Sequence, residues 1–175
     1  MCRKCGGRWR AAQVRLNSLR MGKWLGVSIV VILLDQMTKY LAEARLVYAE
    51  PLAVLPSFNL TLLYNRGAAF SFLSDAGGWQ RWFFVTVSLL ASVALVIWLR
   101  KLKPEQWQLA LALSLVLGGA LGNLIDRLWL GHVVDFIQVY YRDFYWPAFN
   151  IADSAITVGA ILLLWDGLFL QRKED

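Results

Sequence analysis

Four long apolar segments restrict this chain to a small set of folds. They run over residues 24–41, 79–99, 107–125 and 151–170, and each is close to the roughly 20 residues that a helix needs to cross a bilayer. Hydrophobic residues make up 58% of the 175 residues and charged residues only 17%, which leaves too few polar side chains to cover a soluble domain. We therefore predict an all-α integral membrane protein with four transmembrane helices.

The basic residues gather at the ends of these segments and predict the orientation of the chain. Residues 1–23 hold seven Lys or Arg, residues 100–106 hold three, and residues 171–175 hold two, whereas the other side holds five when Arg81, at the start of the second segment, is included. By the positive-inside rule both termini are cytoplasmic, and residues 42–78 and 126–150 face the other side. We interpret the net charge of +6 as this topology signal and expect no nucleic-acid partner.

The same segments define the predicted domain boundaries. Residues 24–172 form one four-helix membrane domain, between a basic cytoplasmic tail at residues 1–23 and a short cytoplasmic tail at residues 173–175. Met21 is a candidate start site, which makes residues 1–20 a candidate non-native extension.

Both cysteines lie in this N-terminal region, as a CxxC pair formed by Cys2 and Cys5. A zinc or redox site would need a second ligand pair or a surrounding fold, and the single histidine, His132, is far away in the sequence. We therefore predict no metal site and no cofactor.

The connection between the first two apolar segments contains predicted β-structure. Pro51 and Pro56 interrupt it, and the stretch FNLTLLYN, residues 58–65, is rich in β-forming, partly alternating residues. We expect a small extracytoplasmic β-sheet cradle at the outer surface of the membrane, beside the four helices.

Five aspartates lie in or beside the apolar segments: Asp35, Asp126, Asp135, Asp153 and Asp166. Because a carboxylate near the bilayer centre costs roughly 2.5–3.5 kcal/mol, each is a candidate functional residue. Asp35 has Lys39 one helical turn later, which favours a structural ion pair. Asp126 is followed at once by Arg127, which favours a salt bridge at a helix end. Asp166 is close in sequence to basic residues at the cytoplasmic end, which favours an anchoring role.

Asp135 and Asp153 differ from the others, because no basic residue adjoins them apart from His132. The two can meet at one membrane depth, where sharing a single proton makes the pair tolerable. Such a pair suits amide hydrolysis, since one carboxylate takes a proton from water while the other donates one to the substrate. A metal hydrolase would need more histidines, and a Ser–Lys nucleophile would need an uncharged lysine, whereas Lys39 has Asp35 beside it.

Three asparagines can serve such a site without titrating: Asn65, Asn123 and Asn150. Asn123 and Arg127 are four residues apart, so they share a face if the third helix continues that far. Asn150 lies three residues before Asp153, and the sequence leaves two roles open for it, a helix N-cap and a site residue.

Five stretches, in this order along the chain, resemble the lipoprotein signal peptidase (signal peptidase II) family: DQMTK (35–39), YNRGAAFSF (64–72), GGALGNLIDR (118–127), VVDF (133–136) and FNIADSAI (149–156). The resemblance implies an intramembrane aspartyl endopeptidase that removes signal peptides from bacterial prolipoproteins by cleaving before a diacylglyceryl-modified cysteine. It also implies the bacterial cytoplasmic (inner) membrane as the location, with an active site near the periplasmic face.

By these motifs, the resemblance implies that Asp135 and Asp153 are the catalytic pair. The positions expected to bind substrate are Asn65, Gly67, Asn123, Arg127 and Asn150, and those expected to support the structure are Asp35, Lys39 and Asp126. The expected partners are diacylglyceryl-modified prolipoproteins and membrane lipids, and the protein is expected to be a monomer. Two alternatives belong to other classes: a small proton-coupled membrane carrier, against which the lack of an inverted sequence repeat argues, and a non-enzymatic membrane scaffold.

Overall fold

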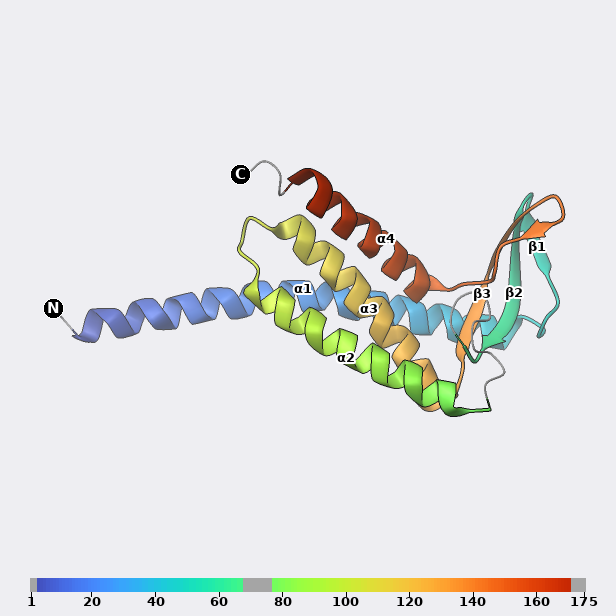
Figure 1. Ribbon diagram of the computed structural model, residues 1–175, viewed down its shortest axis with the longest axis horizontal. Helices are drawn as coiled ribbons and strands as arrows, with labels where there is room; N and C mark the ends of the chain where they lie inside the picture. The colour runs from blue at the N-terminus through green and yellow to red at the C-terminus, as the bar shows by residue number, and fades with distance from the viewer. Residues whose placement is uncertain (1–2, 68–76, 171–175) are drawn as a thin grey trace.

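The computed structural model describes residues 3–67 and 77–170. Its helices are α1 (Arg3–Arg45), α2 (Trp79–Lys101), α3 (Trp107–Trp129) and α4 (Ile151–Trp165), which continues into the π-helical segment η2 (Asp166–Leu170). Its strands are β1 (Leu52–Leu55), β2 (Phe58–Asn65), β3 (Val133–Tyr141) and β4 (Phe144–Tyr145). Four long apolar helices with a small antiparallel sheet at one end confirm the predicted fold class (Figure 1).

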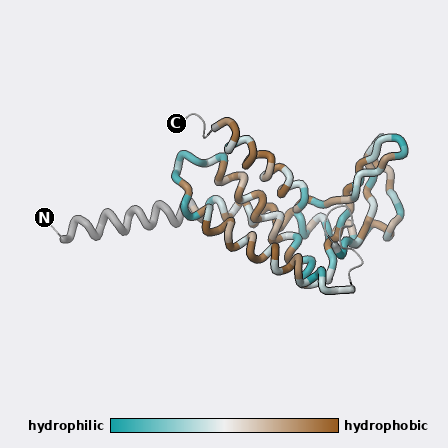
Figure 2. Tube along the Cα trace, in the orientation of Figure 1, coloured by the Kyte–Doolittle hydropathy of each residue, from teal (hydrophilic) through white to brown (hydrophobic). Residues whose placement is uncertain are grey.

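All four helices are long and apolar enough to cross a membrane. The candidate spans are Met21–Arg45, Trp79–Lys101, Trp107–Trp129 and Ile151–Phe169. Apolar residues follow the helices in Figure 2, and their large side chains, such as Leu33, Leu90 and Leu164, are exposed on the outer helix surfaces. The start of α1 and the end of α4 lie at the same end of the molecule, opposite the sheet (Figure 1), as an even number of spans requires.

Two helices extend beyond their predicted limits. The third continues past Ile125 to Trp129, which places Asp126 and Arg127 on its last turns. The first begins at Arg3, so the helix includes most of the stretch expected to form a basic tail. The short second tail, residues 173–175, lies outside the described residues.

Small residues let the neighbouring helices approach α3, which contacts α1, α2 and α4. A Cβ at Gly118 would lie 2.7 Å from the Val31 side chain of α1, and one at Gly122 would lie 2.7 Å from the Asp35 carboxylate. A Cβ at Gly119 would collide with the backbone of Ala152 in α4. These glycines therefore bring the polar residues of α1 and α4 to the same part of α3.

The sheet has the strand order β1-β2-β3-β4, with antiparallel neighbours. Val134 and Phe136 of β3 pack with Leu62 of β2 against Ala42 near the end of α1, which attaches the sheet to the helices. Because side chains alternate along a strand, Asp135 points to the opposite face from its two neighbours. The fold thereby directs one carboxylate of the sheet towards the helix ends.

Candidate active site

Asp135 lies in the first half of β3, and two asparagine amides hold its carboxylate. Asn150 Nδ2 donates to Asp135 Oδ1 at 2.7 Å, and Asn65 Nδ2 donates to Asp135 Oδ2 at 3.2 Å. Asn65 ends the neighbouring strand β2. Asn150 is close because Phe149 pairs with Ile137 of β3, which carries the chain past Asp135 into α4.

Asp153 lies in the first turn of α4, where Asn150 also acts. Asn150 is the N-cap of this helix, and its Oδ1 accepts a hydrogen bond from the Asp153 backbone N–H at 2.9 Å. The Asp153 carboxylate itself accepts from Asn123 Nδ2 at 2.7 Å. The two roles left open for Asn150 therefore coexist: one end of its amide caps the helix, and the other contacts Asp135.

The two asparagines connect the two carboxylates. Asn150 Nδ2 also lies 3.3 Å from Asn123 Oδ1, so hydrogen bonds run from Asp135 through Asn150 and Asn123 to Asp153. The structure thus brings together the two aspartates that lack a basic neighbour in the sequence, although they lie on different elements. Amide groups do not titrate, so they can orient both carboxylates without fixing the protonation of either.

Asp135 is in a setting that favours its neutral form. Its side chain is only 3% exposed. This burial, with a further contribution from the charge of Asp153, raises the pKa of Asp135 to about 7. The hydrogen bonds from Asn65 and Asn150 oppose the rise, because they stabilise the carboxylate. Asp135 is therefore positioned to gain or lose a proton near neutral pH.

A buried ionic cluster contacts the Asn123 side chain. Lys39 Nζ is 2.8 Å from Asp35 Oδ2, 2.7 Å from Asp126 Oδ2 and 3.0 Å from Asn123 Oδ1. The expected pairing of Asp35 with Lys39 is confirmed. Gln36, which is not among the predicted residues, donates to Asp126 Oδ1 at 2.7 Å. The cluster joins α1 to α3 and, through a hydrogen bond from the Ala152 N–H to Asp35, to the start of α4.

The expected salt bridge between Asp126 and Arg127 is wrong. Successive residues of a helix point about 100° apart, and here Asp126 faces α1 whereas Arg127 turns the other way. Arg127 Nη1 contacts the Asn123 carbonyl at 3.3 Å, and Nη2 contacts the Gly67 carbonyl at 3.2 Å. Gly67 in turn donates its N–H to Asn65 Oδ1 at 3.0 Å.

Arg127 therefore ties the end of β2 to α3 beside Asp135. Its guanidinium also lies over the ring of Phe84, 5.2 Å from the ring centroid. The predicted motif YNRGAAFSF continues beyond Gly67 into residues 68–72, which lie outside the described part of the chain.

A cavity of about 590 Å³ opens beside this network. Its polar side includes Asn65, Asn123, Arg127 and Asp153, and its apolar side includes Trp146, Pro147, Phe149, Ile156 and Val158. Asp153 borders this cavity and is half-buried, whereas Asp135, which accepts a hydrogen bond from Asn65, is buried and is not among the lining residues. The apolar side is absent from the predicted site, although the run of aromatic residues just before Asn150 is a sequence signal that could have indicated it.

Ser154 adjoins Asp153 and borders the same cavity, but its hydroxyl donates to the Asn150 carbonyl at 2.9 Å. This is the usual bond of a helical serine to the preceding turn, and it leaves no base oriented towards the Ser154 oxygen among the contacts of the described residues. The geometry therefore favours water activated by carboxylates over a serine nucleophile.

Comparisons with known proteins agree with this chemistry. The family model described as signal peptidase (SPase) II matches residues 27–169. A lipoprotein signal peptidase of Acinetobacter baumannii is 59% identical over 151 residues, covering 86% of both chains. That of Teredinibacter turnerae is 57% identical over 155 residues, covering 89% of this chain and 92% of the relative. That of Pseudomonas aeruginosa is 53% identical over 153 residues, covering 86% and 90%.

Two solved structures of bacterial membrane enzymes, determined by the in meso method, have the same fold. Both have a TM-score of 0.73 and 36% sequence identity. One match covers 84% of this chain and 90% of the other, and the second covers 85% and 94%. The carrier and scaffold alternatives find no support in these matches. From its sequence, its fold and its relatives, the chain belongs to the signal peptidase II family, the aspartic peptidases that remove signal peptides from prolipoproteins.

Proposed function

We propose that Asp135 and Asp153 are the catalytic pair of this peptidase. The observation that carries the proposal is the continuous path of hydrogen bonds from one carboxylate to the other through Asn150 and Asn123. A buried and a half-buried carboxylate, both oriented by neutral groups beside a cavity with one polar and one apolar side, are the arrangement that a shared-proton hydrolase needs.

The two aspartates would divide the proton transfers of peptide hydrolysis between them. The raised pKa of Asp135 supplies a protonated carboxyl at neutral pH. Asp153, which borders the cavity, takes a proton from a water molecule as that water attacks the peptide carbonyl. Asp135 donates its proton to the carbonyl oxygen, which gives a diol. The diol collapses as Asp153 passes the proton that it took from water to the leaving amine, and Asp135 takes a proton back from a diol hydroxyl. No covalent intermediate forms, and the chemistry requires no metal or other cofactor.

The residues around the pair would hold the substrate backbone. Asn123 and Arg127 border the cavity and offer donors to peptide carbonyls, and Asn65 borders it at the end of β2. Gly67 and Asn150 contribute indirectly, because Gly67 holds Asn65 and Arg127 while Asn150 holds Asp135. The substrate is a prolipoprotein cut just before its diacylglyceryl-modified cysteine. The apolar wall, which includes Trp146 and Ile156, suits the signal helix and the acyl chains.

The protein would work as a monomer in the bacterial cytoplasmic membrane, with membrane lipids around its helices. The end of the helical bundle that carries both termini would face the cytoplasm, because the short loop at residues 100–106 and both tails hold most of the basic residues. The sheet and the catalytic pair would then lie near the periplasmic face, where a lipid-anchored cysteine presents its scissile bond.

Cleavage of a diacylated prolipoprotein by purified variants tests this proposal. Asp135→Asn and Asp153→Asn should each lower kcat by roughly 10²–10⁴-fold, since each removes one partner of the proton transfers. Thermal unfolding in detergent should show that both variants remain folded. EDTA should leave wild-type cleavage unchanged.

Asp126→Asn is the matched control, because it also neutralises a buried aspartate near the site but one that contacts Lys39 and Gln36. It should lower stability more than it lowers kcat. An inactive but stable Asp126→Asn, together with an Asp135→Asn that cleaves at the wild-type rate, would show that the wrong aspartate has been chosen.

A further inference from the structure

A second cavity, of about 630 Å³, lies where α2 begins and α3 ends. It shares none of its described lining residues with the catalytic cavity. Three basic side chains from three different segments line it: Arg66 after β2, Arg81 in the first turn of α2, and His132 just before β3. The fold therefore gathers positive charge at a place that the proposed proteolysis does not use.

The Arg81 guanidinium is held in a fixed orientation. Its Nε donates to the Arg127 carbonyl at 2.8 Å and its Nη2 to the Leu128 carbonyl at 2.7 Å, at the end of α3. Carbonyl groups accept these hydrogen bonds without neutralising the charge, and Nη1 remains on the side of Gly131, which lines the same cavity. Among the described residues that line this cavity, none is acidic.

His132 adds a buried nitrogen to the same wall. Its Nε2 atom is inaccessible to solvent and has no hydrogen-bond partner among the described residues. Burial lowers the pKa of His132. The carboxylate of Glu43 opposes this most strongly, the charge of Arg66 lowers the pKa further, and Asp126 and the Leu130 carbonyl raise it by smaller amounts. An anion in the cavity would favour the protonated ring, whose positive charge would add to that of the two arginines.

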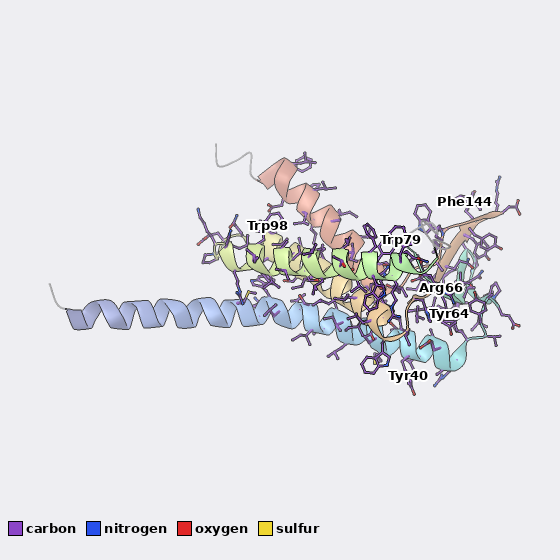
Figure 3. The ribbon with its side chains drawn as sticks, turned by 60° about the horizontal axis from the view of Figure 1, so that its bottom comes forward. Tyr40, Tyr64, Arg66, Trp79, Trp98 and Phe144 are labelled. Atoms are coloured by element: carbon purple, nitrogen blue, oxygen red, sulfur yellow. The ribbon has the colours of Figure 1, made fainter. Side chains whose placement is uncertain are left out.

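The position of the cavity in the fold indicates the source of such an anion. Trp79 and Trp82 at the start of α2 and Trp129 at the end of α3 are 54%, 60% and 86% exposed. Exposed tryptophans at the ends of apolar helices are typical of the membrane–water interface, where lipid headgroups lie. Figure 3 shows Arg66 and Trp79 at the same end of the molecule, whereas Trp98 lies towards the other end of α2.

We propose that this cavity binds the phosphate of an anionic phospholipid from the outer leaflet of the bilayer. The guanidinium groups of Arg66 and Arg81 suit a phosphodiester, since arginine pairs with phosphate oxygens in a bidentate way. The acyl chains of the lipid would lie along the apolar outer surface of α2, on the part of the helix that follows Trp82. Free phosphate has the same binding chemistry but lacks the acyl chains, so the two sources can be distinguished.

The site does not depend on the assignment of the catalytic pair, but it has a physical connection to the catalytic cavity. Arg81 bonds to the carbonyl of Arg127, whose side chain borders that cavity. A bound lipid that steadies Arg81 would therefore also steady the last turn of α3, on which Arg127 lies.

Native mass spectrometry tests the site. The full chain is mixed in detergent with equal amounts of phosphatidylglycerol and phosphatidylcholine, and the lipids that stay bound after the detergent is removed are identified. Wild type should retain one phosphatidylglycerol in preference to phosphatidylcholine. Arg66→Gln should weaken this binding roughly fivefold, as expected for one basic residue near an anionic lipid, and Arg66→Gln with His132→Gln should weaken it further. Arg81→Lys keeps the positive charge but loses the planar guanidinium that can bind phosphate in a bidentate way. It should weaken binding less than Arg66→Gln does.

Arg142→Gln is the matched control, because Arg142 is an exposed arginine on the sheet hairpin, over the ring of Tyr141 and outside this cavity. Equal loss of binding in Arg142→Gln would mean that general surface charge retains the lipid, and it would overturn the proposal. Wild type alone is a second test: equal retention of both lipids, or displacement of phosphatidylglycerol by millimolar inorganic phosphate, would also overturn it.

Discussion

Lys39 Nζ donates to Asn123 Oδ1 at 3.0 Å, and this contact determines the orientation of the Asn123 amide. An ammonium group can only donate, so it selects the oxygen end of the amide and turns Nδ2 towards Asp153, which accepts at 2.7 Å. The buried cation on α1 therefore orients the carboxylate on α4 through one intermediate side chain. Lys39 acts here as a positioning residue rather than as a reacting group.

The first prediction concerns the loss of this cation. Lys39→Met leaves Asp35 and Asp126 buried without their positive partner, which typically costs about 3–5 kcal/mol of unfolding free energy. The variant should therefore unfold at a much lower temperature than wild type in detergent. Its cleavage activity should fall as well, because the Asn123 amide loses the charged donor that orients its oxygen.

A triple variant separates the two effects. Lys39→Met combined with Asp35→Asn and Asp126→Asn removes the unpaired charges, so much of the lost thermal stability should return. Activity should stay low, because Asn123 Oδ1 loses its charged donor and keeps only the longer contact from Asn150 Nδ2. Recovery of wild-type cleavage in the triple variant would show that Lys39 serves stability alone.

The second prediction concerns the pH dependence of cleavage. If Asp135 must be protonated to donate to the substrate, kcat/KM should fall as pH rises through about 7, its raised pKa. The hydrogen bond from Asn65 stabilises the ionised form and holds this pKa down. Asn65→Ala should therefore move the alkaline limb of the pH–rate profile to higher pH, and a limb that stays in place would contradict the assignment.

The same pKa also predicts how stability varies with pH. Between the ordinary value of 3.8 and about 7, the native protein binds more protons at Asp135 than the unfolded chain does. The unfolding free energy should therefore decrease as pH rises across this range. Asp135→Asn lacks the titrating group, so its melting temperature should depend less on pH than that of wild type.

The sequence predicts the helices and the catalytic pair for reasons that are local. Each span is visible as an apolar block, and the stretch at residues 58–65 corresponds to β2. Asp135 and Asp153 differ from the other aspartates because no basic residue adjoins them in the chain. Their proximity in the structure agrees with this reasoning, and their catalytic role stays a prediction until the variants are measured.

The remaining contacts are not predictable from local sequence, because they depend on how α1 meets α3. Gln36 bonds to Asp126, 90 positions away, and no spacing within either helix indicates this. The interpretation of Asp126 as a partner of Arg127 is wrong for the same reason, since adjacency in sequence does not make two helical side chains face each other. The strand β3 is also not among the predicted elements.

The fourth prediction concerns the packing of α3 against α4. Gly119→Ala places a Cβ against the backbone of Ala152, next to Asp153. The backbone cannot rotate away as a side chain could, so α3 and α4 must move apart. We expect a loss of about 1–3 kcal/mol in stability and lower activity, because the first turn of α4 shifts. Gly26→Ala is the matched control: nothing lies within 4 Å of its Cβ position, so both properties should stay near wild type.

The last prediction concerns orientation, and cysteine labelling tests it. In a background with Cys2→Ser and Cys5→Ser, single cysteines at Ser57, Tyr141 and Lys103 lie at exposed positions, two beside the sheet and one in the loop between α2 and α3. An impermeant maleimide added to intact inner-membrane spheroplasts should label the cysteines at positions 57 and 141 but not the one at position 103. Position 103 should react only after the membrane is opened. Because the loop and the sheet lie at opposite ends of the helices, labelling of position 103 from outside would place the sheet and both aspartates on the cytoplasmic side, away from the lipid-anchored cysteine of an exported prolipoprotein (Figure 1).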